Sequence, residues 1–462
     1  MNVLLTHSNH VFYDEKQSAK MEPYPPLQML LAAAVLRDAG LSVQVCDIAL
    51  ESPEEKLSAA IKQAAPDLVV VCEDDFNFIT KMCLSRNRQL AFWTAATAKA
   101  HGCRTAVHSS DSSDHAGDYI AAGFDYVLIG EVEETVRELA TGERPETIAG
   151  LVYPDSDSGR LCRNVPRKLR PDLDDLPLPA WDLIDIEPYR QAWLKHHGYF
   201  SLNLVSSRGC PFHCNWCAKP VWGNNYRVRS PFRVAEEMSY VKRCFAPDHI
   251  WFADDIFALS ARWTTAFADA VEQLRAHIPF KMQSRCDLMT RETVADLKRA
   301  GCSSVWMGAE SGSQRILDAM EKGTRVQQVY QARENLKRNG IKTGLFLQFG
   351  YPGEKWSDIK ATIDMVRDAQ PDDVGVSVTY PLPGTRLYQL VASGLTGKTN
   401  WRESGDLSMM FRGTFSTELY RALAHAIHLE VRSRESTQAI ADAWALVEAL
   451  KPVDVCPMGV AS

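Results

Sequence analysis

The chain has 462 residues, of which 45% are hydrophobic and 24% are charged, a composition that allows sizeable buried cores and excludes a disordered chain. Its formal net charge of −7 leaves no excess of basic residues to neutralise phosphates, so we expect no nucleic acid partner. The first residues lack the cationic and apolar segments of a signal peptide, and no apolar run is long enough to cross a membrane. We therefore expect a cytoplasmic protein without a membrane partner, whose 12 cysteines stay reduced.

Residues 1–145 alternate short apolar segments with helical patterns, which predicts a Rossmann-like, doubly wound parallel sheet. The predicted strands are Val3–Leu5, Ser42–Val45, Leu68–Val71, Thr105–His108 and Tyr126–Ile129. Such sheets bind ligands at the carboxyl ends of their strands. The residues expected to line that edge are His7, Asn9, His10, Asp47, Glu73, Asp74, Ser109, Ser110 and Gly130.

This segment resembles a cobalamin-binding domain. The resemblance rests on Pro26-Leu27-Gln28 before a helix, on Asp47, and on Gly130-Glu131 after a strand. It implies cofactor contacts from Ser109, Ser110, Gly130 and Glu131. The cobalt-ligating Asp-x-His-x-x-Gly sequence is absent, and serines replace the Gly-Gly pair that usually admits the cofactor tail. Either the serine hydroxyls substitute as hydrogen-bond donors, or the groove is empty or repurposed.

The loop that contains these serines could also ligate a separate metal ion through His108, Asp111, Asp114 and His115. A turn rich in Ser and Asp is more typical of a solvated, helix-capping segment. His7 and His10 could approach cobalt, but an ordinary loop role is favoured. Residues 146–198 are predicted to be a connector with a hairpin and the proline-rich stretch 176–181, which resists helix and strand alike.

Six further strand–helix units predict a partial (β/α)6 TIM-type barrel in residues 199–395, followed by a short helical C-terminal region in 396–462. The predicted strands are Ser201–Val205, His249–Phe252, Lys281–Ser284, Ser304–Gly308, Gly344–Phe349 and Asp373–Val378. The fold class is therefore α/β, with the Rossmann-like sheet first. Active residues of such barrels come from the carboxyl ends of the strands.

The first barrel strand leads into Cys210, Cys214 and Cys217, with Trp216 before the last cysteine. Thiolates are the ligands of iron–sulfur clusters, and three of them leave one iron of a [4Fe–4S] cluster open. A zinc knuckle would need a second cysteine pair, whereas the other nine cysteines stand apart. The Cys-x3-Cys-x2-Cys spacing resembles the radical S-adenosylmethionine (radical SAM) superfamily, in which the open iron chelates SAM.

Later strand ends carry further motifs of that superfamily. The resemblance implies SAM contacts from Trp216, Ala253, Asp254, Asp255, Ser284, Arg285, Glu310 and Gly350. A guanidinium at Arg285 would match the SAM carboxylate. Each motif also has a structural alternative: Asp254-Asp255 could cap a helix, Glu310 could form a salt bridge inside the barrel, and Gly350 could serve a turn.

The order of these motifs most resembles the branch related to anaerobic magnesium-protoporphyrin IX monomethyl ester cyclase. It implies an enzyme that splits SAM, generates a 5'-deoxyadenosyl radical and abstracts hydrogen from a small organic substrate, with electrons from a donor such as flavodoxin or ferredoxin. If cobalamin binds, methylation of an unactivated carbon is the leading reaction. Oxidative cyclisation or rearrangement without methyl transfer is the alternative. An iron–sulfur electron carrier or a SAM-binding regulatory protein would be a different class.

Overall fold

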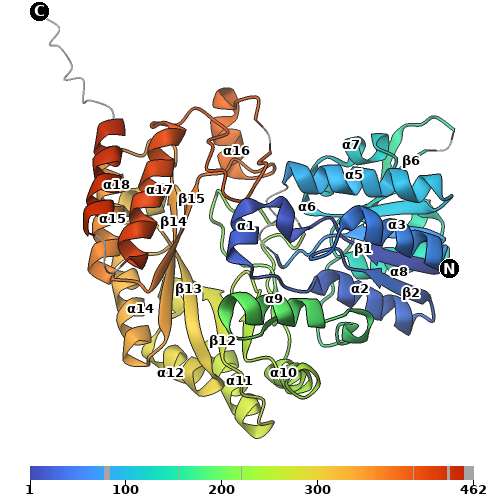
Figure 1. Cartoon of the computed structure of the whole chain (residues 1–462), viewed down its shortest axis with the longest axis horizontal. Coiled ribbons are helices and arrows are strands. Elements are labelled where there is room, and N and C mark those ends of the chain that lie inside the picture. Colours follow the sequence, from blue (N-terminus) through green and yellow to red (C-terminus); the bar gives the residue numbers. More distant parts are fainter. Residues whose placement is uncertain (78–83, 156, 220, 399, 434–436, 452–462) are drawn as a thin grey trace, which may run out of the picture.

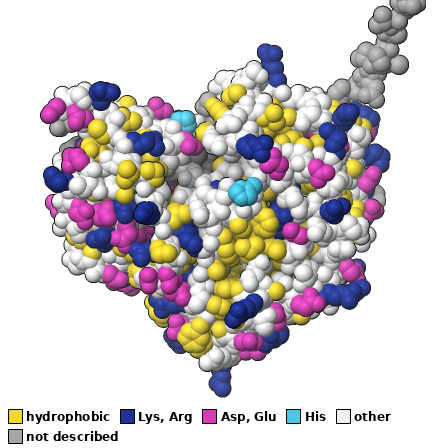
Figure 2. Space-filling model, turned by 180° about the vertical axis from the view of Figure 1, so that it is seen from behind, with side chains coloured by type: hydrophobic (Ala, Val, Ile, Leu, Met, Phe, Trp, Pro, Cys, Tyr) yellow, Lys and Arg dark blue, Asp and Glu magenta, His cyan; other side chains and the backbone are white. Residues whose placement is uncertain are grey.

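The computed structural model describes residues 1–462 except 78–83, 156, 220, 399, 434–436 and 452–462. Two α/β halves lie side by side, each built around one sheet, with α1 (Glu15–Lys20) and α9 (Glu187–His197) between them (Figure 1). Seen from behind, acidic and basic side chains are interspersed over the surface, and apolar side chains gather near the middle of that face (Figure 2). No helix among the described residues is both long and apolar enough to span a membrane.

The first sheet has the order β2-β1-β3-β4-β5-β6-β7, and its first five strands pair in parallel, as predicted. Those strands are β1 (Asn2–Thr6), β2 (Ser42–Cys46), β3 (Leu68–Cys72), β4 (Arg104–His108) and β5 (Tyr126–Leu128). The helices around them are α2 (Leu27–Asp38), α3 (Pro53–Ala64), α5 (Ser85–Ala100), α6 (Ser110–Asp114), α7 (Ala116–Ala121) and α8 (Val132–Thr141). All five strand predictions agree with the structure to within one residue at each end.

The hairpin predicted within the connector joins this sheet. Strands β6 (Leu151–Pro154) and β7 (Leu161–Arg163) add to β5 in antiparallel fashion, so the sheet is mixed and extends beyond residue 145. Gly150 makes the return of the chain possible: its φ is +76°, and a Cβ there would lie 2.5 Å from the carbonyl oxygen of Ile129.

The second sheet has the order β15-β14-β13-β12-β11-β8, with every pair parallel. Its strands are β8 (Ser201–Leu204), β11 (His249–Phe252), β12 (Phe280–Ser284), β13 (Cys302–Glu310), β14 (Lys342–Phe349) and β15 (Asp373–Val378). The helices that follow the strands are α10 (Pro231–Phe245), α11 (Ala261–Gln273), α12 (Arg291–Ala300), α13 (Gln314–Ala319), α14 (Val326–Arg338) and α15 (Trp356–Ala369). Because β8 and β15 are opposite edges, this is a partial barrel, as predicted.

The C-terminal region is helical only in part. Helix α16 (Arg386–Val391) precedes an irregular segment. Helix α17 (Thr417–Arg432) then packs beside β15, and α18 (Thr437–Leu450) packs against α17 (Figure 1). The prediction of helix from Trp401 onward is wrong for residues 401–416, where the chain crosses the barrel end and pairs only at an isolated bridge, Leu395 with Phe411. Met410 and Phe411 are buried there, in agreement with a core role.

Helix α2 belongs to the hydrophobic cores of both halves. It begins after Pro25-Pro26, where a missing N–H costs no helical hydrogen bond, and ends before Gly40 at φ +77°. Met29, Ala32 and Leu36 pack into the first sheet, whereas Leu27 and Leu30 join the core of the barrel half. The helix is therefore buried on nearly all sides and fixes the two halves against each other.

Candidate functional site

The cysteine loop leaves the barrel through a narrow neck. After β8, the two-residue strands β9 (Ser207–Arg208) and β10 (Arg227–Val228) pair antiparallel and hold the two ends of the loop together. Gly209 lies directly before Cys210 with φ +78°, and a Cβ on it would lie 2.1 Å from the carbonyl oxygen of Asn225. No other residue fits this turn, so glycine sets the position at which the first thiol emerges.

Both arms of the loop are anchored by hydrogen bonds. Lys219 donates from Nζ to the carbonyl oxygens of Cys210, at 3.0 Å, and Phe212. Asn215 donates from its backbone N–H to the carbonyl of Met320 at 3.0 Å and from Nδ2 to that of Ala319 at 2.7 Å. The loop is thereby fixed to the end of α13 as well as to its own neck.

The three thiols are close enough to influence one another electrostatically. Burial, together with the charges of Asp255, Cys214 and Cys210, raises the pKa of Cys217 to about 12, although Lys219 opposes the rise. Three thiolates and the Asp255 carboxylate carry more negative charge than Lys219 alone balances, which favours a cationic centre, and soft thiolates suit iron. Among the described residues no three His, Cys, Asp or Glu side chains converge on one point as ligands of a single ion do. Each thiolate of a four-iron cluster binds its own iron, so the donor set fits such a cluster.

The end of β11 is tied to the end of β8 through Asp254. Its buried carboxylate accepts hydrogen bonds from the N–H of Ser206 at 3.1 Å, from Ser206 Oγ at 2.8 Å and from Ser207 Oγ. Burial raises its pKa to about 6, against the effect of these bonds. The alternative role of Asp254-Asp255 as a helix cap is wrong, because Ser260 caps α11. Ala253 is buried beside Asp254, and the exposed Asp255 acts on the cysteine thiols.

Arg285, at the end of β12, lies against the cysteine loop. Its guanidinium stacks 3.7 Å from the centroid of the Phe212 ring and donates to the two carboxylate oxygens of Asp287 at 3.0 and 3.1 Å. It also donates to the carbonyl oxygen of Lys322 at 2.8 Å. The preceding Ser284 is occupied by a bond from its hydroxyl to the carbonyl of Phe257 at 2.9 Å.

Glu310 and Lys322 form a buried ion pair at the end of β13. Lys322 Nζ lies 2.7 Å from Glu310 Oε1, and both side chains are 7% exposed. Burial alone would lower the pKa of Lys322, but Glu310 and the thiol of Cys214 outweigh it and raise that pKa. The salt bridge considered as an alternative for Glu310 is therefore present. Lys322 was missed by sequence reasoning, because it follows a short helix with no motif around it.

The turn after β14 lies at the same end of the sheet as Arg285, two strands away. Gly350 has φ +80°, its N–H donates to Glu354 at 2.8 Å, and a Cβ there would lie 3.0 Å from the sulfur of Met409. Trp216 packs against the apolar cluster that contains Tyr351. The structure thus brings Trp216, Gly350, Arg285 and Glu310 around the cysteine loop at the carboxyl ends of the barrel strands.

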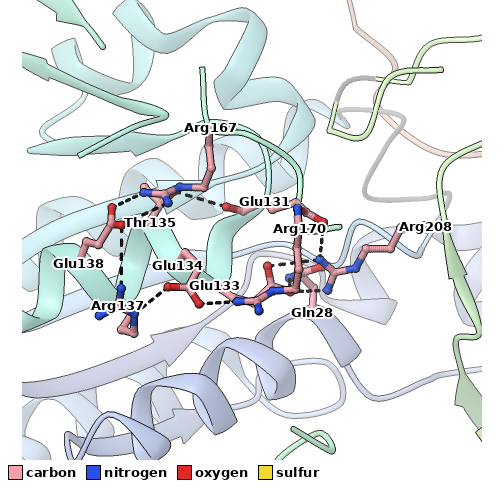
Figure 3. Close-up of polar contacts among 10 residues, drawn as sticks. All are labelled: Gln28, Glu131, Glu133, Glu134, Thr135, Arg137, Glu138, Arg167, Arg170 and Arg208. Atoms are coloured by element: carbon pink, nitrogen blue, oxygen red, sulfur yellow. Dashed lines mark hydrogen bonds and ion pairs between the residues drawn. The ribbon is translucent and has the colours of Figure 1, made fainter. Parts of the chain in front are cut away.

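A buried ion-pair network joins the first half of the chain to this loop (Figure 3). Arg208, one residue before Gly209, donates to Glu131 at 2.8 Å and to Glu133, whose carboxylate also accepts from Gln28 at 3.0 Å. Arg227 adds a second bond to Glu131, at 2.8 Å. Glu131, expected to contact a cofactor, is thus engaged by two arginines of the barrel half. Neither arginine carried a sequence signal for this role.

The edge of the first sheet is occupied by internal hydrogen bonds. Ser109 caps α6 by accepting from the N–H of Ser112 at 2.8 Å, and Ser110 is buried next to it. His108 contacts Asp75 through Nε2 at 2.6 Å, and His7 contacts Asp47 at 2.8 Å. His10 bonds the carbonyl oxygen of Ile48 through Nδ1 at 2.8 Å.

Two features at this edge bear on a corrinoid ligand. Open space lies before Gly130, since a Cβ there would meet nothing within 4 Å. A cavity of about 10 Å³ is lined by Ser8, Glu73 and Ser109, and Glu73 keeps one buried oxygen, Oε2, without a hydrogen-bond partner. Burial raises the pKa of Glu73. The orphaned oxygen suits the amide groups at a corrin periphery, although the cavity holds little more than one water molecule as it stands.

With this geometry in place, a comparison with known families decides the kind of domain. Residues 204–366, from the end of β8 through most of α15, match the model of the radical SAM superfamily. They form a radical SAM domain. The segment contains the three cysteines and the ends of the strands described above.

Curated relatives and solved structures extend the comparison. The chain is 31% identical to an uncharacterized methyltransferase of Pyrococcus horikoshii and 25% identical to the anaerobic magnesium-protoporphyrin IX monomethyl ester cyclase of Rubrivivax gelatinosus. These matches cover 60% and 58% of this chain, but only 61% and 49% of the relatives. The fold resembles the methyltransferase TsrM of Kitasatospora setae, solved with cobalamin and a [4Fe–4S] cluster bound, with a TM-score of 0.71 at 18% identity over 99% of this chain and 92% of TsrM. The cobalamin-dependent radical enzyme OxsB gives a TM-score of 0.73 at 17% identity over 92% of this chain and 66% of OxsB.

Proposed function

We propose that the chain is a radical SAM enzyme that holds a [4Fe–4S] cluster through Cys210, Cys214 and Cys217. The observation that carries the proposal is the anchored loop: three thiols at the carboxyl end of a partial barrel, with no fourth cysteine beside them among the described residues. When bound and reduced, such a cluster supplies one electron that splits SAM into methionine and a 5'-deoxyadenosyl radical. The protein supplies a fixed loop, charge balance and shelter from water.

The residues around the loop are arranged to bind SAM. Arg285 can exchange its bonds with Asp287 for the SAM carboxylate, because a guanidinium binds any carboxylate with the same bidentate geometry. Lys322 neutralises Glu310, which leaves that carboxylate available for neutral polar groups. The backbone at Ala253–Asp255 and the turn at Gly350 complete the pocket, with Ser284 and Trp216 as supporting contacts.

Arg285→Ala should weaken SAM binding about tenfold or more, because it removes a charge-assisted, two-bond contact. Iron content should stay unchanged, because Arg285 stacks on Phe212 but holds no cluster atom. Equilibrium dialysis of SAM against anaerobically reconstituted protein, with iron assayed in parallel, measures both. Arg338→Ala, on the exposed face of α14, is the matched control. Unaltered SAM affinity in Arg285→Ala would leave this arginine a structural role only.

Methylation of an unactivated carbon of a small organic substrate, with cobalamin as methyl carrier, is the reaction we favour. Cobalamin would be held at the edge of the first sheet by Ser109, Ser110, Gly130 and Glu73, with Glu131 acting through its ion pairs with the barrel half. When bound, cobalamin supplies a methyl group to the substrate. The likeness to cobalamin-containing folds and the orphaned Glu73 oxygen support this proposal.

Hydroxocobalamin added to the purified protein should be retained at about one equivalent through gel filtration, and Ser110→Trp should block retention sterically. With SAM labelled in its methyl group, a methylase forms both 5'-deoxyadenosine and S-adenosylhomocysteine. Ser239→Trp, on the opposite half, is the control variant. Formation of 5'-deoxyadenosine without retained corrinoid or S-adenosylhomocysteine would contradict methyl transfer.

That contrary result would favour cyclisation or rearrangement, with or without cobalamin. Two observations favour a reaction without methyl transfer: the cavity beside Glu73 is small, and Glu131 is already bonded to Arg208. A different class, an electron carrier or SAM-binding regulator, would need no pocket of Arg285, Glu310 and Lys322 beside the loop. In the division of labour we propose, residues 1–145 bind the corrinoid and 146–198 connect the halves, with the hairpin β6–β7 extending the first sheet. Residues 199–395 perform the radical chemistry, and the described part of 396–462 covers the barrel beside β15. A flavodoxin or ferredoxin would supply electrons in the cytoplasm.

A further inference from the structure

The inner face of the second sheet is incompletely filled. In a closed barrel the inward side chains pack the interior. Here the inward side chains of Gln283, Trp306, Phe346 and Ser377 remain partly exposed, while those on the opposite face of the same strands are buried under helices. The lumen beside β12–β15 therefore offers accessible surface.

Two glycines allow aromatic rings to lie flat on this face. Gly344 is the register partner of Trp306, and a Cβ on it would lie 2.3 Å from Trp306 Cδ2. Gly375 is the partner of Phe346, and a Cβ there would lie 3.0 Å from Phe346 Cδ1 and 3.5 Å from Trp306 Cζ3. The indole thus rests on the backbone of β14 and reaches toward β15. One face of the ring covers the sheet, and the other is turned to the lumen.

We call Trp306 and Phe346 the aromatic shelf. Their ring centroids are 4.9 Å apart with planes inclined by 33°. Among the described residues, neither ring belongs to a hydrophobic core cluster or packs against one. Both rings are partly exposed. A large apolar surface outside the hydrophobic clusters is an unmet packing surface.

The aromatic shelf adjoins the proposed cofactor pocket. Gly308 is the register partner of Phe346, and a Cβ on Gly308 would lie 2.5 Å from Glu310 Oε1 and 2.6 Å from Lys322 Nζ. The Glu310–Lys322 pair therefore folds back onto the same inner face, next to the shelf. A ligand on the shelf would lie on the barrel side of the SAM pocket.

A buried polar atom stands at the rim. Gln348 follows Phe346 by two residues, so its side chain shares the inner face, and it is 2% exposed. Its carboxamide oxygen, Oε1, has no hydrogen-bond partner. Because an unpaired buried acceptor costs free energy, a ligand with a donor group at this point would be stabilised.

We propose that the aromatic shelf and Gln348 bind the substrate, and that the substrate is a planar conjugated ring system with an N–H or O–H donor at its edge. The ring stacks on Trp306 and Phe346, and the donor bonds to the carboxamide oxygen of Gln348. This inference rests on the proposed function, because it assigns the substrate class of the same radical site. A saturated or strongly puckered molecule would lose the stacking contact, and a planar molecule without a donor would leave Gln348 unpaired.

The test uses the full chain, reconstituted anaerobically and saturated with SAM, with four probes in equilibrium dialysis. Indole and carbazole are planar donors, benzothiophene is planar without a donor, and octahydroindole is saturated. We expect indole or carbazole to bind, and octahydroindole to bind about tenfold more weakly or not at all. Trp306→Leu should weaken the binding of the planar probes about tenfold. Gln348→Leu should abolish the preference for indole over benzothiophene.

Trp444→Leu, a partly exposed tryptophan on α18, is the matched control and should bind like wild type. Phe346→Leu provides a second shelf variant should Trp306→Leu fail to fold by circular dichroism. Equal binding of planar and saturated probes, or wild-type affinity in both shelf variants, overturns the assignment. If wild type cleaves SAM but binds neither indole nor carbazole, only this inference fails. If wild type does not cleave SAM, the proposed function fails.

Discussion

Cys214→Ala should reduce SAM cleavage to the background rate, because two remaining thiolates cannot hold a four-iron cluster. Wild-type protein, reconstituted with iron and sulfide without oxygen and then reduced, should carry about four irons at this site and release 5'-deoxyadenosine. Cys210→Ala and Cys217→Ala should behave in the same way, since each thiolate is expected to bind a different iron. Chromatography of the nucleoside product and an iron assay measure the effect.

Cys244→Ala is the matched control. Cys244 is exposed on α10, away from the cysteine loop, so its loss should alter neither iron content nor cleavage. Undiminished SAM cleavage by Cys214→Ala would remove the basis of the radical SAM assignment for this loop.

Arg208→Met should lower the free energy of unfolding by about 3–5 kcal/mol, because it leaves the buried carboxylate of Glu133 without its arginine. Arg208 and Glu133 are each 3% exposed, so water cannot take over the lost contact. The midpoint of urea unfolding measures the loss. Adding Glu133→Gln to Arg208→Met should restore part of the lost stability, because the double variant no longer buries the unpaired charge of Glu133.

Arg299→Met is the control for a surface ion cluster. Arg299 is 39% exposed and contacts Asp269, Glu272 and Asp296, so its loss should cost less than about 1 kcal/mol. A loss in Arg208→Met no larger than that in Arg299→Met would contradict the role assigned to the buried network.

The same network predicts a pH dependence. Burial alone would raise the pKa of Glu133, but Arg208 outweighs it and holds the pKa at about 2, below the ordinary value of 4.5. The ionised carboxylate therefore stabilises the folded state fully above about pH 4.5 and loses that effect as the pH falls toward 2. The stability advantage of wild type over Arg208→Met should be largest near neutral pH and shrink as the pH falls. The unpaired Glu133 of the variant first takes up a proton in the folded state, and below about pH 4.5 wild type then loses the contribution of its ionised pair.

Local patterns in the sequence were sufficient for the strands and for the cysteine loop. The strands of both sheets were predicted from short apolar runs in the sequence. Because active residues of such barrels lie at the carboxyl ends of the strands, Arg285, Glu310 and Gly350 were then expected around the cysteines. These features depend on residues close together in the chain or on a regular succession of strands. The assignment of individual SAM and corrinoid contacts to those residues stays a prediction.

Long-range pairing was beyond that reasoning. Arg208 meets Glu133 across 75 residues, and the hairpin β6–β7 joins the first sheet although its composition resembles that of a connector. Lys322 reaches Glu310 only because the chain turns back after α13. Which side chains form these long-range pairs depends on how the chain packs in three dimensions. Periodicity and short motifs in the sequence do not contain that information.

The segment before α2 packs against the barrel half of the chain. Pro23 and Pro25 accept hydrogen bonds from Trp193 and Asn203 at 2.7 and 2.9 Å, and Tyr24 packs 4.8 Å from Trp251 on the inner face of β11. The N-terminal segment thus closes the part of the lumen that lies opposite the aromatic shelf. A barrel half expressed without residues 1–145 would lose these contacts and expose the inner face of β8 and β11 at that point.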